Sequence, residues 1–256
     1  MLISAGDIIK SSWELFAKNW RKLFVYMALL LLPSVVLSIL GVVSLYMSAY
    51  VPSSTISTSI IIALVGAASV VFTLWTAIAF AKVLYNCLKN QAVGEWKSVY
   101  SSSSGLIWPI IYTSFLVSLI VMGGTLLFII PGIIFMIWYS FSFYTVVFEG
   151  KTWMQALTAS KSLVAGRWWS ILWRLFLPGF VFGLLAGVAA TLCSYLIELI
   201  PLSAITNAVV ERVVSSVINI IITPVTAAAS LILYVSAKEN PISMPAPQTP
   251  EPPKMP

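Results

Sequence analysis

The sequence predicts an all-α polytopic membrane protein with six transmembrane helices and with interfacial amphipathic helices on the cytoplasmic side. Of its 256 residues, 60% are hydrophobic and only 9% are charged, whereas about 25% of the residues in a soluble domain are charged. Three long stretches, residues 47–81, 98–148 and 175–197, carry no charge at all. Charge-free apolar windows of this length are typical of membrane spans. This composition excludes a soluble enzyme, a nucleic-acid-binding protein and a secreted disulfide scaffold.

The apolar windows divide into six spans. An α-helix rises 1.5 Å per residue, so about 20 residues cross a hydrocarbon core about 30 Å thick. The predicted spans run near residues 23–48, 57–81, 105–129, 133–148, 175–195 and 213–236. The fourth span is short. We interpret Ile130-Pro131-Gly132 as the tight turn that precedes it, because proline and glycine commonly mark turns.

The basic residues predict the orientation of the chain. Thirteen of the fourteen Lys and Arg residues flank the six windows on one side, and only Arg212 lies on the other. The positive-inside rule therefore predicts cytoplasmic N- and C-termini in a prokaryotic cytoplasmic (inner) membrane. An even number of spans requires the same arrangement. A charged lead-in of 22 residues argues against a cleavable signal peptide, and the basic side suits anionic lipid headgroups.

The first 22 residues predict an amphipathic helix. Ser4 and Asp7 resemble a capping box, with Ile3 and Ile8 as a hydrophobic staple. Apolar residues then recur at three- and four-residue steps, at Ile9, Trp13, Phe16, Trp20 and Leu23. Such a helix is suited to the headgroup plane of a membrane.

A second amphipathic helix is predicted before the fifth span. Thr152 and Gln155 suit a capping box, and Gly166 suits the end of the helix. Its less polar face comprises Trp153, Ala156, Leu157, Ser160, Leu163 and Val164. Tryptophans near the predicted spans are expected to anchor the protein at the membrane interface. These anchors are Trp13, Trp20, Trp153, Trp168 and Trp169.

The two amphipathic stretches share a spacing that hints at internal repetition. Ser12, Leu15, Ala17 and Trp20 align without gaps with Ser160, Leu163, Ala165 and Trp168. Residues 96–108 are a candidate for a degenerate third copy. The hypothesis is a unit of one interfacial helix and one two-span hairpin, repeated three times.

Small residues predict where helices pack. Gly179, Gly183 and Gly187 follow each other at four-residue steps in the fifth span, the spacing at which membrane helices approach closely. Their partner is another span of the same chain or a second copy, and we favour the former. Asn219 is the amide side chain deepest within a span and is expected to hydrogen-bond to another helix.

Other residues are given structural roles. Pro33 and Pro224 lie within spans, where each is expected to kink its helix. Cys87 and Cys193 are interpreted as small packing residues. Residues 1–238 form the predicted membrane domain, whereas residues 239–256 are rich in proline and predict a disordered cytoplasmic tail.

The sequence also lacks the residues that are typical of catalytic, metal-binding and ion-conducting sites. It contains no histidine, the commonest general base and zinc ligand. Charged side chains fall at the ends of the predicted spans, whereas ion and proton pathways place them within the membrane. We therefore predict no catalytic residue, no metal site and no cofactor.

Several short motifs resemble a known family. Ile130-Pro131-Gly132-Ile133 leads to Trp138 and Phe141, and Leu15-Phe16 with Asn19-Trp20 resembles the opening of that family. The motif continues through Glu149-Gly150, Ala156-Leu157, Ser160, Leu163 and Gly166-Arg167-Trp168. These features resemble prokaryotic multi-span proteins related to the membrane domain of glycerophosphodiester phosphodiesterases. The catalytic histidines and carboxylates of the fused enzyme have no counterpart here, so the resemblance implies no catalytic role.

Taken together, the sequence predicts a non-enzymatic scaffold or lipid-interacting accessory subunit. Its predicted partners are a bilayer with anionic headgroups and either a membrane protein or a second copy of the chain, without nucleic acid. The alternative is a small transporter or channel for neutral or apolar solutes, motivated by Pro33, Pro224, Asn219 and the glycine stripe.

Overall fold

The computed structural model describes residues 2–50, 55–200 and 204–241, and throughout these ranges the regular elements are α-helices. The helices are α1 (Ala5–Tyr50), α2 (Thr55–Leu88), α3 (Trp96–Ser104), α4 (Ile107–Leu127), α5 (Ile129–Trp138), α6 (Ser142–Glu149), α7 (Trp153–Val164), α8 (Trp168–Glu198) and α9 (Ala204–Glu239). By length and composition, six segments of the described chain are long and apolar enough to cross a membrane, and one of them, Ile129–Glu149, combines α5 and α6. The predicted class, an all-α multi-pass membrane protein, is confirmed.

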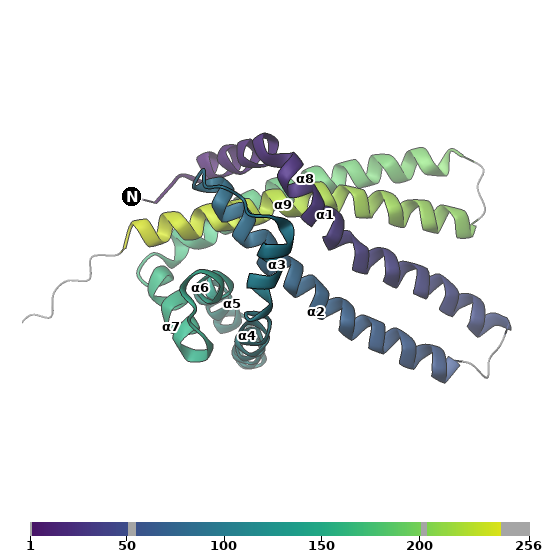
Figure 1. Cartoon of the computed structure of the whole chain (residues 1–256), viewed down its shortest axis with the longest axis horizontal. Helices are drawn as coiled ribbons and strands as arrows, with labels where there is room; N and C mark the ends of the chain where they lie inside the picture. The colour runs from purple at the N-terminus through teal and green to yellow at the C-terminus, as the bar shows by residue number, and fades with distance from the viewer. Residues whose placement is uncertain (1, 51–54, 201–203, 242–256) are drawn as a thin grey trace, which may run out of the picture.

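The helices form three hairpins, α1/α2, α4/α5 and α8/α9. Two of them, α1/α2 and α8/α9, extend in the same general direction, whereas α4 and α5 are seen nearly end-on and run across the others (Figure 1). We call the end of the molecule that carries the N-terminus and the end of α9 the basal end. The distal arms are residues 34–50 of α1, 55–71 of α2, 179–198 of α8 and 204–223 of α9.

The buried core lies at the basal end. Side chains from most helices meet there with almost no exposed surface, among them Leu23, Leu84, Phe141, Ile171, Leu233 and Tyr234. Aromatic stacking adds to this packing. The rings of Tyr26 and Tyr100 lie parallel with centroids 6.0 Å apart, and Tyr100 also donates a hydrogen bond to Thr76.

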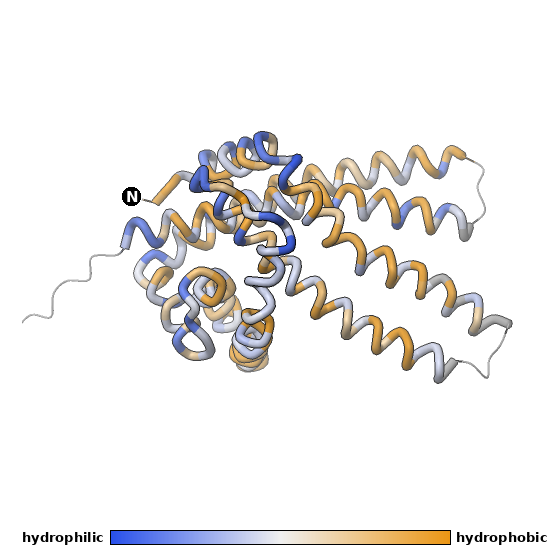
Figure 2. The backbone as a smooth tube through the Cα atoms, viewed as in Figure 1, coloured by the Kyte–Doolittle hydropathy of each residue, from blue (hydrophilic) through white to orange (hydrophobic). Residues whose placement is uncertain are grey.

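The distal arms bury little of their surface. Large apolar side chains point outward along all four helices, including Ile39, Leu64, Leu184, Leu192 and Val213. Hydropathy follows the same division, since hydrophilic residues gather at the basal end and the arms are mostly hydrophobic (Figure 2). Apolar helices with outward-facing apolar side chains are suited to lipid.

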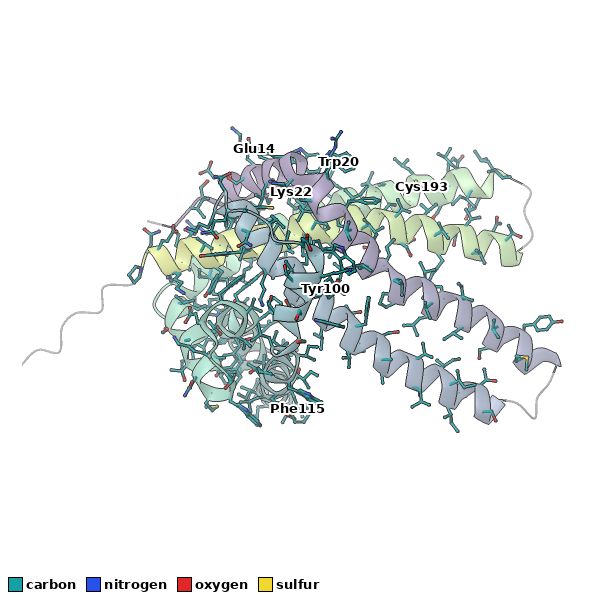
Figure 3. All side chains as sticks on the ribbon, viewed as in Figure 1. Glu14, Trp20, Lys22, Tyr100, Phe115 and Cys193 are labelled. Carbon is teal, nitrogen blue, oxygen red and sulfur yellow. The ribbon has the colours of Figure 1, made fainter. Side chains whose placement is uncertain are left out.

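The N-terminal capping box forms as predicted. The Ser4 hydroxyl donates to Asp7 Oδ2 at 2.6 Å, and the Asp7 N–H donates to Ser4 Oγ at 3.1 Å. The predicted amphipathic helix and the first span are nevertheless one helix, α1, which changes direction near Trp20 and Lys22 (Figures 1 and 3). Continuity of the backbone hydrogen bonds therefore couples the two parts.

The turn predicted at Ile130-Pro131-Gly132 is wrong. These residues lie within α5, and the chain reverses at Phe128, whose extended backbone (φ −159°, ψ 149°) separates α4 from α5. Proline is tolerated in the first turn of a helix because no intrahelical acceptor awaits its missing N–H. Gly132 serves packing, since a Cβ there would lie 3.0 Å from Thr125 Cα.

The predicted fourth span is not one helix. It breaks between Trp138, the last residue of α5, and Ser142, the first residue of α6. Ser160 of α7 stabilises the break. Its hydroxyl donates to the Trp138 carbonyl at 2.7 Å and accepts from the Phe141 N–H at 3.1 Å.

The remaining fold predictions concern helices α1 and α9. Pro33 and Pro224 are buried within helices that continue past them. Helix α9 extends to Glu239, one residue beyond the predicted limit of the membrane domain. Most of the predicted tail, residues 242–256, lies outside the described residues.

Candidate functional site

The connection between α7 and α8 forms the centre of the site. Gly166 adopts a left-handed conformation (φ 81°) that favours glycine. The Arg167 N–H then donates to the Val164 carbonyl at 3.0 Å, and α8 begins at Trp168. This tight turn brings two arginines, Arg167 and Arg174, to the first two turns of a long helix.

Arg167 joins α7 to the end of α9. Its Nε donates to the Leu163 carbonyl at 2.8 Å, while Nη1 and Nη2 donate to the carbonyls of Asn240 and Ala237 at 2.6 and 2.7 Å. Cations are favourable at helix C-termini, where carbonyl groups lack intrahelical partners. Burial lowers the pKa of Arg167 from its usual value.

Arg174 lies about two turns into α8. Its Nε donates to the Ile3 carbonyl at 2.6 Å, and its Nη1 donates to the Ser170 carbonyl at 3.1 Å and to the Ser170 hydroxyl. Within the described ranges, Nη2 has no hydrogen-bond acceptor, and no carboxylate forms an ion pair with Arg174 or Arg167. Neither guanidinium group therefore has a carboxylate partner within the described part of the chain.

A pocket of about 750 Å³ opens beside these arginines. Its lining residues are Gly166, Arg167, Trp168, Trp169, Ser170, Trp173 and Arg174. The first N–H groups of a helix have no acceptor within the helix, and its dipole is positive at that end. Backbone and side chains thus give this pocket a positive electrostatic character, which favours an anion.

A second pocket of about 700 Å³ adjoins the first. The two share Gly166, Trp168 and Trp169. The rest of the second pocket is almost entirely apolar, and comes from Ile130, Ile133, Ile134, Trp138, Ala165 and Leu172. Together the pockets form an amphipathic site, cationic on one side of the two tryptophans and apolar on the other.

Two further polar groups belong to this region. Lys161 Nζ lies 4.1 Å from the centroid of the Trp138 ring, a cation–π arrangement that adds a third positive charge near the apolar pocket. Trp168 Nε1 is buried and has no hydrogen-bond acceptor among the described residues. A buried N–H without an acceptor is uncommon in folded proteins.

A separate polar cluster surrounds Glu149 at the end of α6. Its Oε1 accepts from the Tyr234 hydroxyl at 2.8 Å and from Lys238 at 3.0 Å, and its Oε2 accepts from Lys151 at 2.8 Å. Gly150 (φ 64°) ends the helix there. The cluster joins α6 to α9. We interpret it as structural, because the donors of both lysines and of the tyrosine already converge on one carboxylate.

The predicted tryptophan anchors differ in exposure. Trp13, Trp20, Trp153 and Trp169 are 51%, 50%, 52% and 70% exposed. Trp168 packs partly against the core and forms a wall of both pockets. Four of the five therefore point outward, whereas Trp168 belongs to the candidate site. Interfacial anchoring by these residues stays a prediction.

The predicted glycine stripe does not pack against another helix within the described residues. A Cβ added at Gly179, Gly183 or Gly187 would meet nothing within 4 Å. The reason is the orientation of α8, which buries the neighbouring face carrying Pro178 and Phe182. Contact of the stripe with a second copy stays a prediction. The close glycine contacts lie instead between α4 and α5, where a Cβ at Gly124 would lie 2.6 Å from the Phe135 ring.

Asn219 also differs from its prediction. Its side chain is exposed, and no hydrogen bond joins it to any described part of the chain. The cysteines, in contrast, are free thiols at packed positions, with Cys87 buried and Cys193 half-buried on α8 (Figure 3).

Sequence reasoning missed the arginines as a pair. In the sequence Arg167 belongs to the Gly166-Arg167-Trp168 motif, and Arg174 is one of the charged residues at the ends of the predicted spans. Helical spacing does not relate the two, because Arg167 precedes α8 with a non-helical backbone (φ −139°, ψ 27°); the available signal is the three tryptophans between them, Trp168, Trp169 and Trp173.

Comparison of the chain with family models, curated proteins and solved structures finds no match in any of the three. The resemblance to the membrane domain of glycerophosphodiester phosphodiesterases therefore stays a prediction.

Proposed function

We propose that this membrane protein binds an anionic phospholipid at its basal end and acts as a non-enzymatic scaffold or accessory subunit. In this proposal the headgroup phosphate lies at the first turns of α8, beside Arg167 and Arg174. The acyl chains lie along α5, against Ile133 and Ile134. The observation that carries the proposal is a pair of guanidinium groups that have no carboxylate partner among the described residues and that lie next to adjoining cationic and apolar pockets.

The chemistry of a phosphate group suits the cationic pocket. A helix N-terminus offers N–H donors and a favourable dipole to an anion, and Arg174 Nη2 is an additional donor aligned in a rigid planar group. Charge-assisted hydrogen bonds of this kind are stronger than neutral ones. A phosphate oxygen that accepted a hydrogen bond from Trp168 Nε1 would also satisfy this buried indole N–H, which has no acceptor among the described residues.

The basal end is proposed to face the cytoplasm of a prokaryotic cell. Within the described residues, every Lys and Arg except Arg212 lies outside the distal arms, and the positive-inside rule assigns the basic side of a membrane protein to the cytoplasm. The cytoplasmic leaflet is also the more anionic one, so its lipids complement a cationic pocket.

The alternative, a transporter or channel for neutral solutes, has less support. Both pockets lie at the basal end and are lined by no residue of the distal arms. Of the residues that motivated the alternative, Asn219 and the glycine stripe face outward from the arms, whereas Pro33 and Pro224 are buried within helices that continue past them. A transporter or channel would need a polar path through the distal arms.

Lipid titration followed by native mass spectrometry tests the proposal. The purified protein in detergent is titrated with phosphatidylglycerol and, separately, with phosphatidylcholine. We expect tighter binding of the anionic lipid. Arg174→Gln should weaken phosphatidylglycerol binding roughly ten- to a hundredfold, because one charge-assisted hydrogen bond contributes about 1.5–3 kcal/mol.

Arg21→Gln is the matched control. Arg21 is exposed and lies over the Trp20 ring, 5.7 Å from its centroid, away from both pockets. Its loss should change either affinity less than twofold. Arg174→Lys, which keeps the charge, should retain a preference for phosphatidylglycerol. Equal binding of the two lipids by the wild-type protein, or unchanged binding by Arg174→Gln, would overturn the proposal.

A further inference from the structure

The turn of the α4/α5 hairpin is entirely apolar and exposed. Five consecutive residues are 71–80% exposed, namely Leu126, Leu127, Phe128, Ile129 and Ile130. The chain carries no charge from residue 98 to residue 148, so no charged side chain lies near this turn in sequence. A hairpin that emerged on the distal side of a bilayer would expose all five side chains to water, and that is unfavourable.

The second arm of this hairpin is too short to cross a bilayer. Helix α5 has ten residues and is therefore about 15 Å long, about half of the hydrocarbon thickness. The chain then breaks, and Phe141, at the break, is fully buried in the basal core. From the turn, α5 leads directly back to the basal end.

The turn also lies beside the basal start of α8. Ile130 lines the apolar pocket together with Trp169 and Leu172, which belong to the first two turns of α8. Helix α8 extends to Glu198, about 39 Å beyond Leu172 at 1.5 Å per residue. The hairpin runs across the long helices rather than along them (Figure 1).

The backbone of the turn is partly hydrogen-bonded within the chain. Only Phe128 leaves the helical conformation; its N–H donates to the Gly124 carbonyl at 3.0 Å, and its carbonyl accepts from the Gly132 N–H at 3.4 Å. Pro131 has no N–H to satisfy. The N–H groups of Ile129 and Ile130 and the last carbonyls of α4 have no backbone partner among the described residues, as at other helix ends, so internal hydrogen bonds satisfy only part of the turn.

We infer that α4/α5 is a re-entrant hairpin, whose turn is held among acyl chains of the leaflet at the basal end. The chain crosses the bilayer with α1, α2, α8 and α9 only, and an even number of crossings keeps both termini on one side. Because Ile130 lines the apolar pocket, a phospholipid at α8 belongs to that same leaflet. This last step rests on the proposed function, whereas the topology of the hairpin does not.

Cysteine accessibility tests this topology. Single cysteines are introduced as Phe128→Cys, Ser53→Cys and Lys97→Cys in a chain carrying Cys87→Ala and Cys193→Ala. Sealed vesicles of each orientation are treated with a membrane-impermeant maleimide. We expect Lys97→Cys to react from one side, Ser53→Cys from the opposite side, and Phe128→Cys from neither side until detergent is added.

Labelling of Phe128→Cys from the side that labels Ser53→Cys would show that the hairpin crosses, and would overturn the inference. Labelling from the side of Lys97→Cys, at a comparable rate, would show a turn in water and would overturn it as well. Ile129→Cys, also at an exposed position, repeats the test if Phe128→Cys fails to fold. A nitroxide attached at the same position should be relaxed strongly by oxygen and weakly by a water-soluble nickel complex. Lipid binding enters none of these measurements, so failure of the lipid proposal would leave their outcome unchanged.

Discussion

The basal end and the distal arms are built on different principles. At the basal end, polar side chains make specific contacts between helices distant in sequence, such as Ser160 with the break after Trp138 and Glu149 with Tyr234. In the arms, Ser and Thr hydroxyls mostly donate to carbonyls of their own helix, as Ser216 does to Arg212. Specific interactions thus concentrate where the candidate site lies, whereas in the arms a contact between helices is made by Arg212 Nε, which donates to Ser38 Oγ at 3.2 Å.

The largest expected difference between the two regions concerns serine. Ser160→Ala removes a buried hydroxyl that bonds both the Trp138 carbonyl and the Phe141 N–H. Leaving such groups unsatisfied costs about 1–3 kcal/mol each, so we expect the free energy of unfolding to fall by roughly 2–4 kcal/mol. Unfolding by SDS in mixed micelles measures it.

Ser216→Ala in the distal arm of α9 is the control for this experiment. Its hydroxyl bonds within its own helix, to the Arg212 carbonyl at 2.7 Å, so we expect a change below about 0.5 kcal/mol. Equal losses for the two variants would mean that the basal end is not the more specifically bonded region.

The next effect concerns glycine. Gly132→Ala forces a Cβ against the side chain and Cα of Thr125, and overpacking of this kind costs about 1–3 kcal/mol. Gly183→Ala, in the stripe that sequence reasoning singled out, meets open space. Because alanine is the better helix former, by up to about 1 kcal/mol, that variant should be neutral or slightly more stable.

Thermal unfolding in detergent, at low protein concentration, compares the two glycine variants. A lower melting temperature for Gly183→Ala than for Gly132→Ala would contradict the description of α8. If Gly183→Ala is destabilised only at high protein concentration, the stripe contacts a second copy of the chain.

A smaller effect is expected at the basal ion pairs. Glu149→Gln removes the charge that attracts Lys151 and Lys238, at a side chain that is 15% exposed. Both lysines are about half exposed, so solvent screening reduces the expected loss to about 1–2 kcal/mol.

Glu198→Gln, at the exposed end of α8, tests the same change in a distal arm. Among the described residues, Glu198 forms no ion pair, and we expect no measurable change in the SDS titration. A loss at Glu198 as large as that at Glu149 would remove the distinction between the two regions.

Much of the fold was accessible from the sequence. The apolar windows predict the long helices, because burial in lipid needs only length and the absence of charge. The capping box at Ser4 and Asp7 is a local signal and forms as predicted. Helix α7 begins directly after Thr152, although that residue makes no side-chain cap.

The structure of the central hairpin, α4/α5, could not be predicted from local sequence signals. Residues 133–148 contain no charge, no proline and no glycine, so the strongest local signals do not mark the break after Trp138, although Ser140 and Ser142 lie at it. The break is stabilised by Ser160, which lies 22 residues further along the chain, and local patterns do not report such contacts. Proline and glycine favour turns, and the sequence therefore predicts a turn at Pro131 and Gly132. In the structure Pro131 lies in the first turn of α5, and Gly132 allows α5 to pack closely against Thr125 of α4.

The candidate site depends both on residues that are visible in the sequence and on contacts that only the tertiary structure shows. The tryptophans and the two arginines were visible as residues, but their meeting with α5 depends on how the central hairpin crosses α8. Similarly, it is the tertiary structure of the described residues that leaves Arg167 and Arg174 without a carboxylate partner there. Sequence patterns predict a basic interface, whereas the structure provides one candidate binding site within it, beside Arg167 and Arg174 at the start of α8.

The central claim is that a lipid phosphate lies against the guanidinium of Arg174. Solid-state NMR measures it directly, through dipolar dephasing between the phosphorus of phosphatidylglycerol and arginine side-chain nitrogens, because the chain has only four arginines, Arg21, Arg167, Arg174 and Arg212. We predict dephasing in the wild-type protein that is strongly reduced by Arg174→Lys and unaffected by Arg21→Lys. Dephasing that survives Arg174→Lys undiminished, or that is lost with Arg21→Lys, would contradict the claim.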